Sequence, residues 1–357
     1  MFYTYLVYNT ILIFTVVFSI LVEKSRDKLS EYGFRCLLFI TQALPASLRF
    51  GIGTDYWNYV ELYKLYHRTS DSHEIGFQAL ANLLIFFEAH YHIFIVVLSI
   101  LAIAPICFYV PKKHFHYFII IYFFMSYLDI IGASRQDISV AFVTCGIFVL
   151  YSYRGTLKYL IASFLAFLMH YSSFLYFPLI IFKNIILSTK KVYVLLVLTF
   201  VLTAGAGLIE WLFNSALFQD SPYGVYIGSK YVSEAKVGSG LGILANLLIA
   251  LLFLLLYHKS SRYIEHSGFF SVLALLFVGS YLLASQIHIL GRLVNIFLFV
   301  PAFLAYPTCK AISSKYPSLI FLGFFFIYLL IFENSIANNQ IALGSGLGIS
   351  PYISIFD

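Results

Sequence analysis

The chain has 357 residues, of which 61% are hydrophobic and only 11% are charged, and its mean hydropathy is +0.89. Soluble globular domains carry about 25% charged residues, so this composition excludes a soluble domain of any size and indicates a polytopic integral membrane protein. The net charge of +6 at pH 7 comes from basic residues scattered between apolar segments, and these form no basic run of the kind that binds nucleic acid.

Apolar segments long enough to cross a membrane recur along the whole chain. A span needs roughly 20 apolar residues, or fewer when it is tilted or packed inside a bundle. We therefore expect an all-α fold, a polytopic bundle of about twelve transmembrane helices that forms one domain over residues 1–357. The expected spans are residues 2–22, 34–48, 91–110, 116–132, 136–153, 157–170, 172–187, 192–214, 241–257, 268–287, 292–309 and 317–333.

The first span, one short segment and the cysteines each need a separate interpretation. The first apolar segment begins at Phe2 with no basic residue before it and no Ala-x-Ala site, which favours a span over a cleaved signal peptide. Residues 76–88 are short and polar at their start, which indicates an interfacial or half-inserted helix. The four cysteines lie in apolar segments without Cys-x-x-Cys spacing, so neither disulfides nor a zinc site are expected.

The positions of Lys and Arg between the spans predict which connections face the cytoplasm. Cytoplasmic connections are enriched in these residues. The basic connections are 24–28, 112–113, 154–158, 190–191, 259–262 and 310–315, and an even number of expected spans separates them. The remaining connections then face outward with both chain ends, namely loop 49–77, residues 134–136, residues 170–172, loop 215–240, residues 286–292 and the segment from 333.

Three arginines lie at the outward ends of expected spans: Arg49, Arg135 and Arg292. An arginine at membrane depth costs about 2.5–3.5 kcal/mol on insertion scales, so it usually faces a wet cavity or a partner. Its planar, permanently charged fork suits phosphate or carboxylate, and three such forks on one side would suit a pyrophosphate. The alternatives are that each arginine extends to the outer headgroups or pairs with Asp137 or Asp55.

Groups that can transfer protons lie on the same expected side, at His170, Asp55 and Glu74. A general base needs a carboxylate or imidazole within hydrogen-bond reach of the hydroxyl, and a histidine can also donate to phosphate. The alternatives are a structural histidine, and carboxylates that pair with Arg49 or cap the next helix. Loop 49–77 lacks an Asp-x-Asp pair, a His-Glu-x-x-His pattern and a nucleotide phosphate loop, so neither a metal nor another cofactor is expected.

Loop 49–77 also carries the aromatic residues Tyr56, Trp57 and Tyr59. Tyrosine and tryptophan gather at membrane interfaces in any protein of this kind. The sharper hypothesis is that these three rings stack on the faces of sugars, and both interpretations stay open at this point.

Several short motifs follow one another along the chain. They are Arg49-x-Gly-x-Gly-Thr-Asp-Tyr with Tyr59 downstream, Glu74-x-Gly-Phe, Ser134-Arg135-Gln136, His170-x-Ser, an arginine (Arg292) that opens a late span, and Pro351-Tyr352. In this order they resemble the EpsG and Wzy-type polysaccharide polymerases. The resemblance covers most of the chain, and its first motif is the most specific.

This resemblance implies a metal-independent bacterial inner-membrane glycosyltransferase of GT-C architecture that joins lipid-linked repeat units at the periplasmic face. Its donor would be a glycan on undecaprenyl pyrophosphate, its acceptor a second lipid-linked glycan, and a chain-length regulator protein would be a further partner. Arg49, Arg135 and Arg292 would hold the departing pyrophosphate, while His170, Asp55 or Glu74 would act on the acceptor hydroxyl or assist the phosphate. Glycan contacts would come from Thr54, Tyr56, Trp57, Tyr59, Gln136, Ser172 and His288.

Three other classes of membrane protein remain as alternatives. A lipid-linked oligosaccharide flippase or other transporter would place charges near the bilayer midplane, whereas the ionisable residues considered above cluster at one expected face. An O-antigen ligase has a similar architecture but expects a larger periplasmic loop than 215–240. A membrane O-acyltransferase would rest only on the single histidine and arginine.

Overall fold

The computed structural model describes residues 1–65, 74–132, 134–152, 155–204, 215, 219, 240–286, 290–343 and 346–357. In these residues the regular structure is α-helix and 3₁₀-helix, apart from two isolated β-bridges. The expected all-α class is therefore confirmed. Loop 215–240 lies outside the described residues except at positions 215, 219 and 240.

The chain forms two compact units. The first unit consists of residues Met1–Ile180 together with Phe325–Asp357, and the second consists of residues Ile181–Phe324. The first unit contains α1 (Phe2–Lys24), α2 (Lys28–Leu48), α3 (Tyr56–Leu65), α4 (Ile75–Phe86), α5 (Tyr91–Tyr109), α6 (Phe115–Gly132), α7 (Ser134–Ser152), α8 (Thr156–Met169), most of the 3₁₀-helix η2 (Tyr171–Phe182) and the 3₁₀ turn η7 (Ile341–Leu343). The second contains α9 (Thr189–Ala204), α12 (Leu241–Leu255), α13 (Tyr257–Ser260), η5 (Ser261–Tyr263), α14 (Ser267–Ala284), α15 (Gly291–Ile296) and α16 (Val300–Ile312). The boundary between the units falls within α17 (Pro317–Asn338).

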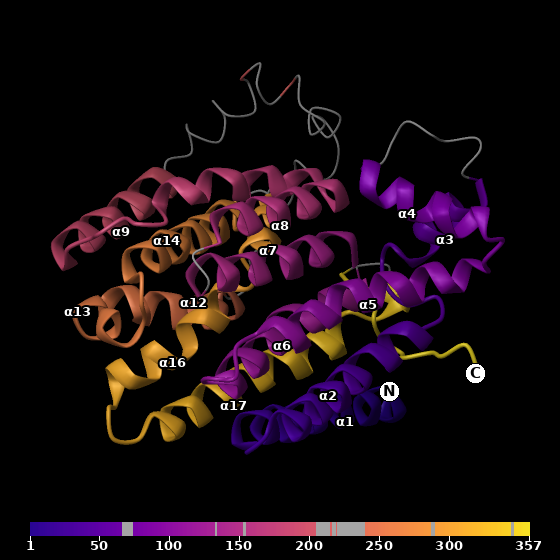
Figure 1. Ribbon diagram of the computed structural model, residues 1–357, viewed down its shortest axis with the longest axis horizontal. Helices are drawn as coiled ribbons and strands as arrows, with labels where there is room; N and C mark the ends of the chain where they lie inside the picture. The colour runs from indigo at the N-terminus through magenta and orange to yellow at the C-terminus, as the bar shows by residue number, and fades with distance from the viewer. Residues whose placement is uncertain are drawn as a thin grey trace. The chain divides into compact units, whose positions relative to one another are not determined.

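The helices of the first unit pack in a continuous series. Helix α2 packs against α1 and α5, and α7 packs against α5 and α8 (Figure 1). Helix α6 lies against α1, α5 and α7, and 15 of its 18 residues are buried. This share is far above that of the more apolar helices α1 and α17, so α6 forms the centre of this unit. The short helices α3 and α4 pack on α5 and α8, respectively.

The second unit is built around α14. This helix packs against α9, α12, α15 and α16, and α12 also packs against α16 (Figure 1). Phe269, Leu273, Ala274 and Phe277 of α14 are fully buried, and their spacing of three to four residues forms the apolar stripe expected of a packed helix.

Several described helices can cross a membrane by length and composition. They are α1, α5, α6, α14 and α17, and α12 with the α13–η5 segment forms a sixth candidate that is bent by 71°. Helices α4, α8 and η2 are apolar but shorter. A polytopic membrane protein is thus supported, while the number of about twelve spans stays a prediction.

Most expected spans coincide with helices to within a few residues, but two do not. The expected span 292–309 is divided into α15 and α16. Pro301 lies in the first turn of α16, where its missing N–H leaves no hydrogen bond unmade. The expected span 172–187 is a 12-residue 3₁₀-helix that contains Pro178. Only the part of span 192–214 up to Ala204 lies in the described residues.

Close packing of α7 on α8 depends on Gly146. A Cβ atom at this position would lie 2.9 Å from Cβ of Ala162, closer than two carbon atoms can pack. Small residues of this kind allow helix backbones to approach each other in a membrane. Gly33 on α2 has no atom within 4 Å of the equivalent position, which makes it a matched control.

We expect Gly146→Ala to lower the free energy of unfolding by roughly 1–3 kcal/mol, because the added methyl overpacks the α7–α8 interface. Gly33→Ala should instead raise stability by up to about 1 kcal/mol through helix propensity. Thermal unfolding of the purified protein in detergent measures both shifts. Shifts of the same sign in the two variants would contradict the close α7–α8 contact.

Candidate functional site

The turn between α2 and α3 lies directly against the end of α6. Gly51 and Gly53 have φ values of +65° and +100°, a region that glycine adopts without steric cost. A Cβ on Gly53 would lie 2.4 Å from the carbonyl oxygen of Ile131. The backbone N–H of Asp55 donates to the carbonyl of Gly132 at 3.2 Å. The glycines of the first motif therefore let the backbone of this turn approach the backbone at the end of α6. This contact fixes the position of Asp55.

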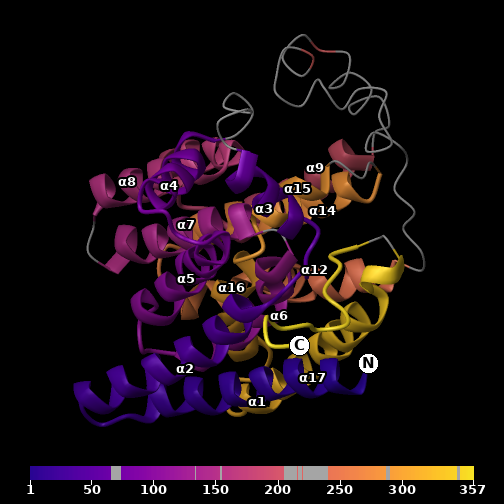
Figure 2. The same cartoon turned by 90° about the vertical axis from the view of Figure 1, so that its right-hand side faces the viewer.

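A second segment, residues 346–357, holds the other side of this turn, and we refer to it as the strap. The N–H groups of Gly53 and Thr54 donate to strap carbonyls at 2.8 and 3.1 Å. The N–H of Phe50 donates to Ile353 at 2.9 Å, and Arg49 forms a β-bridge with Ser354. Both chain ends lie in this region (Figure 2), where the N–H of Tyr352 donates to Thr4 Oγ1 at 3.0 Å.

Arg49 is 1% exposed and bonded on several sides. Nη1 donates to Ser99 Oγ at 2.9 Å and to the carbonyl of Ala46, and Nη2 donates to Ser134 Oγ at 2.9 Å. No ion pair involves Arg49 in the described part of the chain. Burial lowers its pKa, although a guanidinium stays charged in proteins. Arg49 therefore links the end of α2 to α5 and to the start of α7.

Arg135 forms an ion pair with Glu74. Nη1 donates to Glu74 Oε2 at 2.9 Å, with side-chain exposures of 24% and 10%, respectively. The guanidinium carbon lies 5.6 Å from the ring centre of Tyr59 and 5.1 Å from that of Phe77, within cation–π range. Its Nε has no hydrogen-bond partner among the described residues. The sequence alternatives for the partner of Arg135 were Asp137 and Asp55, and the structure shows Glu74 in that place.

Tyr59 connects Asp55 with the start of α7. Its hydroxyl donates to Asp55 Oδ2 at 3.2 Å and accepts from the N–H of Arg135 at 3.3 Å. Burial, and then the charge of Asp55, raise the pKa of Tyr59, so the phenol keeps the proton that it donates. Tyr59 is 3% exposed, which indicates a connecting role for this ring in addition to the predicted sugar contact.

His170 follows α8, which packs against α4 close to Glu74. A Cβ on Gly76 would lie 2.7 Å from the carbonyl oxygen of Leu168, so the start of α4 touches the chain two residues before His170. Nδ1 of His170 accepts from the N–H of Ser172 at 3.2 Å and lies 2.7 Å from Ser172 Oγ. This bonding fixes the ring at the junction of α8 and η2.

The predicted glycan contacts differ in their exposure. Trp57 is 49% exposed, and Thr54 is also exposed. Tyr56 is 1% exposed, and burial raises its pKa to about 12. Gln136 and Ser172 are each 9% exposed. Of the three aromatic residues, Trp57 is therefore the one that presents a large ring to a ligand without rearrangement.

Two of the predicted site residues, His288 and Arg292, come late in the sequence. Arg292 is half-buried and is the second residue of α15 in the second unit. His288 lies outside the described residues. The first unit thus brings together Arg49, Asp55, Glu74 and Arg135 through the contacts described above.

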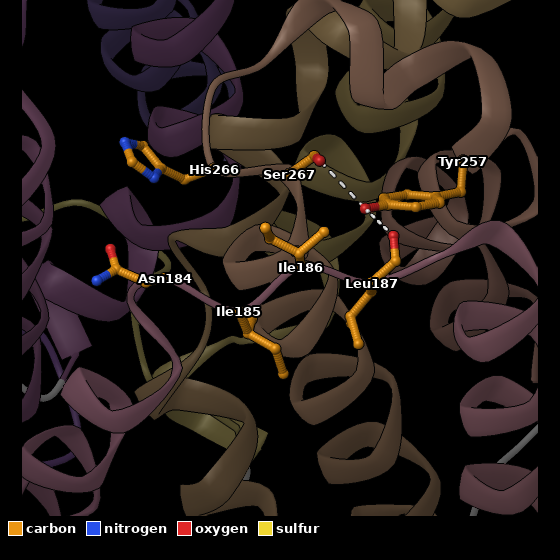
Figure 3. Close-up of a pocket in the computed structure, with 8 residues that line it drawn as sticks. Asn184, Ile185, Ile186, Leu187, Tyr257, His266 and Ser267 are labelled. Carbon is orange, nitrogen blue, oxygen red and sulfur yellow. Dashed lines mark hydrogen bonds between the residues drawn. The ribbon is translucent and has the colours of Figure 1, made fainter.

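A cavity of about 430 Å³ lies within the second unit. Residues 184–187, Tyr257 and residues 266–268 line it (Figure 3). The hydroxyl of Tyr257 donates to the carbonyl of Leu187 at 3.2 Å and lies 3.1 Å from Ser267 Oγ. None of the residues predicted for the site lines this cavity, and its connections belong to the set expected to face the cytoplasm.

One acidic residue was missed at the sequence level. Asp129 lies in the last turn of α6, half-buried, and interacts electrostatically with Asp137 of α7, which is 3% exposed. The hydroxyls of Tyr122 and Ser126 are buried on the same helix, where they interact with each other, and Tyr122 also interacts electrostatically with Asp137. A carboxylate within an otherwise apolar span was the available signal, since such residues usually have a function. Among the described residues no group of three potential metal ligands occurs.

We expect Arg49→Lys to be more destabilising than Arg49→Met. After Arg49→Met, each acceptor keeps another partner, because Ser99 Oγ also bonds the carbonyls of Ala46 and Ile95, and Ser134 Oγ bonds that of Ile130. Replacing a buried charge by an apolar side chain of similar size is then close to neutral. Lysine keeps the buried charge and loses the fork, at a cost of about 1.5–3 kcal/mol. Thermal unfolding in detergent tests this order, and equal losses would contradict it.

Comparison with known proteins supports the motif assignment. The family model of EpsG matches residues 32–354, which is most of the chain. Neither the curated proteins nor the solved structures give a match. EpsG is a family of Wzy-type polymerases, and its members are in general membrane glycosyltransferases that make polysaccharide. With this match and the order of motifs from Arg49 to Tyr352, the chain belongs to the EpsG family.

Proposed function

We propose that this protein joins oligosaccharide repeat units carried on undecaprenyl pyrophosphate, by glycosyl transfer at the periplasmic face of a bacterial inner membrane. Membership in the EpsG family and the apolar helices support a membrane polymerase. The proposed architecture is GT-C-like, with about twelve spans. A chain-length regulator protein is a proposed partner.

The pairing of Arg135 and Glu74 next to Asp55 is the observation that carries this proposal. The Arg135 guanidinium pairs with Glu74 and lies within electrostatic range of Asp55. It contacts the rings of Tyr59 and Phe77, and its buried Nε has no partner among the described residues. These residues come from segments that the charge distribution assigns to one side of the membrane. Glycosyl transfer from a diphosphate needs a cation for the leaving group and a base for the acceptor hydroxyl. The Arg135 guanidinium and the neighbouring carboxylates are groups of these two kinds.

The proposed reaction replaces a sugar–phosphate bond by a sugar–sugar bond. The acceptor hydroxyl attacks the anomeric carbon of the donor, and the lipid diphosphate leaves with the bonding electrons. Negative charge therefore grows on the leaving oxygen in the transition state, and cations placed there beforehand stabilise it. Arg135 and Arg292 are the proposed phosphate ligands. Arg49, which is enclosed, contributes its charge and its bond to Ser134 next to Arg135.

The remaining predicted residues act on the acceptor in this proposal. His170, Asp55 or Glu74 takes the proton of the hydroxyl or assists the phosphate. Exposed Trp57 and Thr54 are placed to contact the glycan, and Tyr56, Tyr59, Gln136, Ser172 and His288 complete the set of proposed contacts.

A lipid-linked oligosaccharide transporter is the second candidate, and one observation favours it. The carboxylates of Asp129 and Asp137 lie on helices within an apolar environment, where transporters place their coupling groups. Purified protein in proteoliposomes, given a defined lipid-linked repeat unit, separates the two. A ladder of polymer products supports the polymerase, whereas movement of intact substrate across the bilayer without a ladder supports transport.

We expect Arg135→Ala to lower kcat/KM by about 10²-fold or more, because the leaving diphosphate loses a charged donor. Arg135→Lys should recover only part of this loss, since an ammonium cannot bond two phosphate oxygens with a planar fork. Polymer ladders at matched protein level measure the effect. Full activity of Arg135→Ala would exclude this residue from phosphate binding.

We also expect single cysteines at Asp55 and Arg135 to react with the same impermeant thiol reagent from the periplasmic side. The proposal requires both positions to face one pocket on one side of the membrane. Labelling in intact spheroplasts and in inverted vesicles distinguishes the two sides. Reaction of the two cysteines from opposite sides would exclude a shared pocket, and reaction of each from both sides would favour transport.

A further inference from the structure

The proposed transfer requires one group to take the proton of the acceptor hydroxyl, and three predicted residues are candidates. We propose that Asp55 takes this proton, that Glu74 holds Arg135 in its phosphate-binding orientation, and that His170 donates a hydrogen bond from Nε2. This division of roles rests on the proposed function and concerns the same site. It follows from how each side chain is already bonded.

Glu74 is committed to Arg135. Its Oε2 accepts from Nη1 of Arg135 at 2.9 Å, and the residue is only 8% exposed. Protonating this carboxylate would leave a partly buried guanidinium without its counter-charge, which is strongly unfavourable. The ion pair therefore suits Glu74 to positioning and not to proton transfer.

The bond to Glu74 occupies Nη1 of Arg135 and leaves Nε buried and without a partner among the described residues. The rings of Tyr59 and Phe77 hold the plane of the guanidinium. An arginine edge with two parallel N–H groups binds two oxygens of one phosphate side by side. Glu74 thus holds Arg135 with a buried donor that lacks a partner among the described residues and that a diphosphate oxygen would satisfy.

His170 is bonded in a way that makes it a donor. The backbone N–H of Ser172 points at Nδ1, with an N–N distance of 3.2 Å. A backbone N–H can only donate, so Nδ1 is the acceptor nitrogen and carries no proton. In neutral imidazole the proton is then on Nε2, an assignment made from the hydrogen-bond network. Such a ring can donate to a phosphate oxygen, but its Nε2 cannot accept a proton.

Asp55 keeps a carboxylate without an ion pair in the part of the chain that the structure describes. Oδ2 accepts one hydrogen bond from Tyr59 at 3.2 Å, and the side chain is half-buried. Asp55 also lies within electrostatic range of Arg135. Its position is fixed by the turn at Gly53, and its remaining lone pairs are available to an acceptor hydroxyl.

The proposed step balances without any further reactant. The acceptor O–H bond breaks, and its proton goes to the Asp55 carboxylate. The oxygen forms a bond to the anomeric carbon of the donor as the bond from that carbon to the phosphate oxygen breaks. The electron pair of the broken bond leaves on the lipid diphosphate, held by the Nε edge of Arg135 and by His170.

Three variants separate these roles, with the exposed Glu61→Gln as a control that leaves kcat unchanged. Asp55→Asn should lower kcat on a defined lipid-linked repeat unit by about 10²–10⁴-fold, with the Kd for inorganic pyrophosphate within about 3-fold of the wild-type value. Glu74→Gln keeps an acceptor oxygen for Nη1 and should lower kcat by no more than about 10-fold. Glu74→Ala should raise the Kd for inorganic pyrophosphate by about 10-fold or more, as expected when a hydrogen bond to a charged group is lost.

The pH dependence gives a second readout that a purely structural role would not change. The kcat of the wild-type protein should fall as the pH drops and the base is protonated, and Asp55→Asn should lose this dependence while Glu74→Gln retains it. If Asp55→Asn does not accumulate, Asp55→Ala should recover activity when formate is added. Lack of rescue, a kcat of Asp55→Asn within about 10-fold of wild type, or an equal loss in Glu74→Gln would overturn the assignment. Absence of any ladder from the wild-type protein would instead contradict the proposed function.

Discussion

The close contact between Gly53 and the last carbonyls of α6 is the constraint on which the candidate site depends. There is no space for a side chain between them, so the turn has one path, and Asp55 follows at a fixed place against Gly132. One helical turn later Tyr59 reaches back to Asp55 and across to the first turn of α7. The strap bonds the same turn from its other side, and so the backbone carrying Asp55 is held from two directions.

Burial separates the roles of arginines that look alike in the sequence. Arg49 and Arg135 both follow an apolar segment and both have the fork that suits phosphate. Both arginines have a buried Nε without a partner among the described residues. The Nη atoms of Arg49 donate to a carbonyl and two serines, and the residue is 1% exposed. Arg135 instead forms an ion pair with Glu74, and its side chain is 24% exposed. The first arrangement builds the base of the site, and the second leaves donors for a ligand.

The sequence predicts the long helices well because hydrophobic length is the main signal for a span. The spans starting near residues 2, 91 and 116 begin within a residue of α1, α5 and α6. The prediction of one continuous helix over 292–309 was wrong. This apolar segment contains Pro301, and the helix starts again there as α16.

Side-chain pairing within the site was harder to predict than the residues themselves. The motif residues Asp55, Glu74 and Arg135 do meet, but the partner of Arg135 is 61 residues away in sequence, and spacing carries no information about such a contact. Asp137, the nearer candidate, sits two residues after Arg135, and residues two apart on a helix do not share a face. Its carboxylate interacts instead with Asp129.

The polar groups on α6 extend this site toward the interior of the helix bundle. Tyr122, Ser126 and Asp129 are spaced at i, i+4 and i+7, so they lie on one face of α6 over roughly 10 Å of its length. Buried polar groups are nearly always hydrogen-bonded, and the hydroxyls of Tyr122 and Ser126, one helical turn apart, interact with each other. A site made only of connecting segments would not need such a stripe. The stripe therefore continues, along α6, the polar surface that begins where Gly53 contacts Ile131 and Gly132.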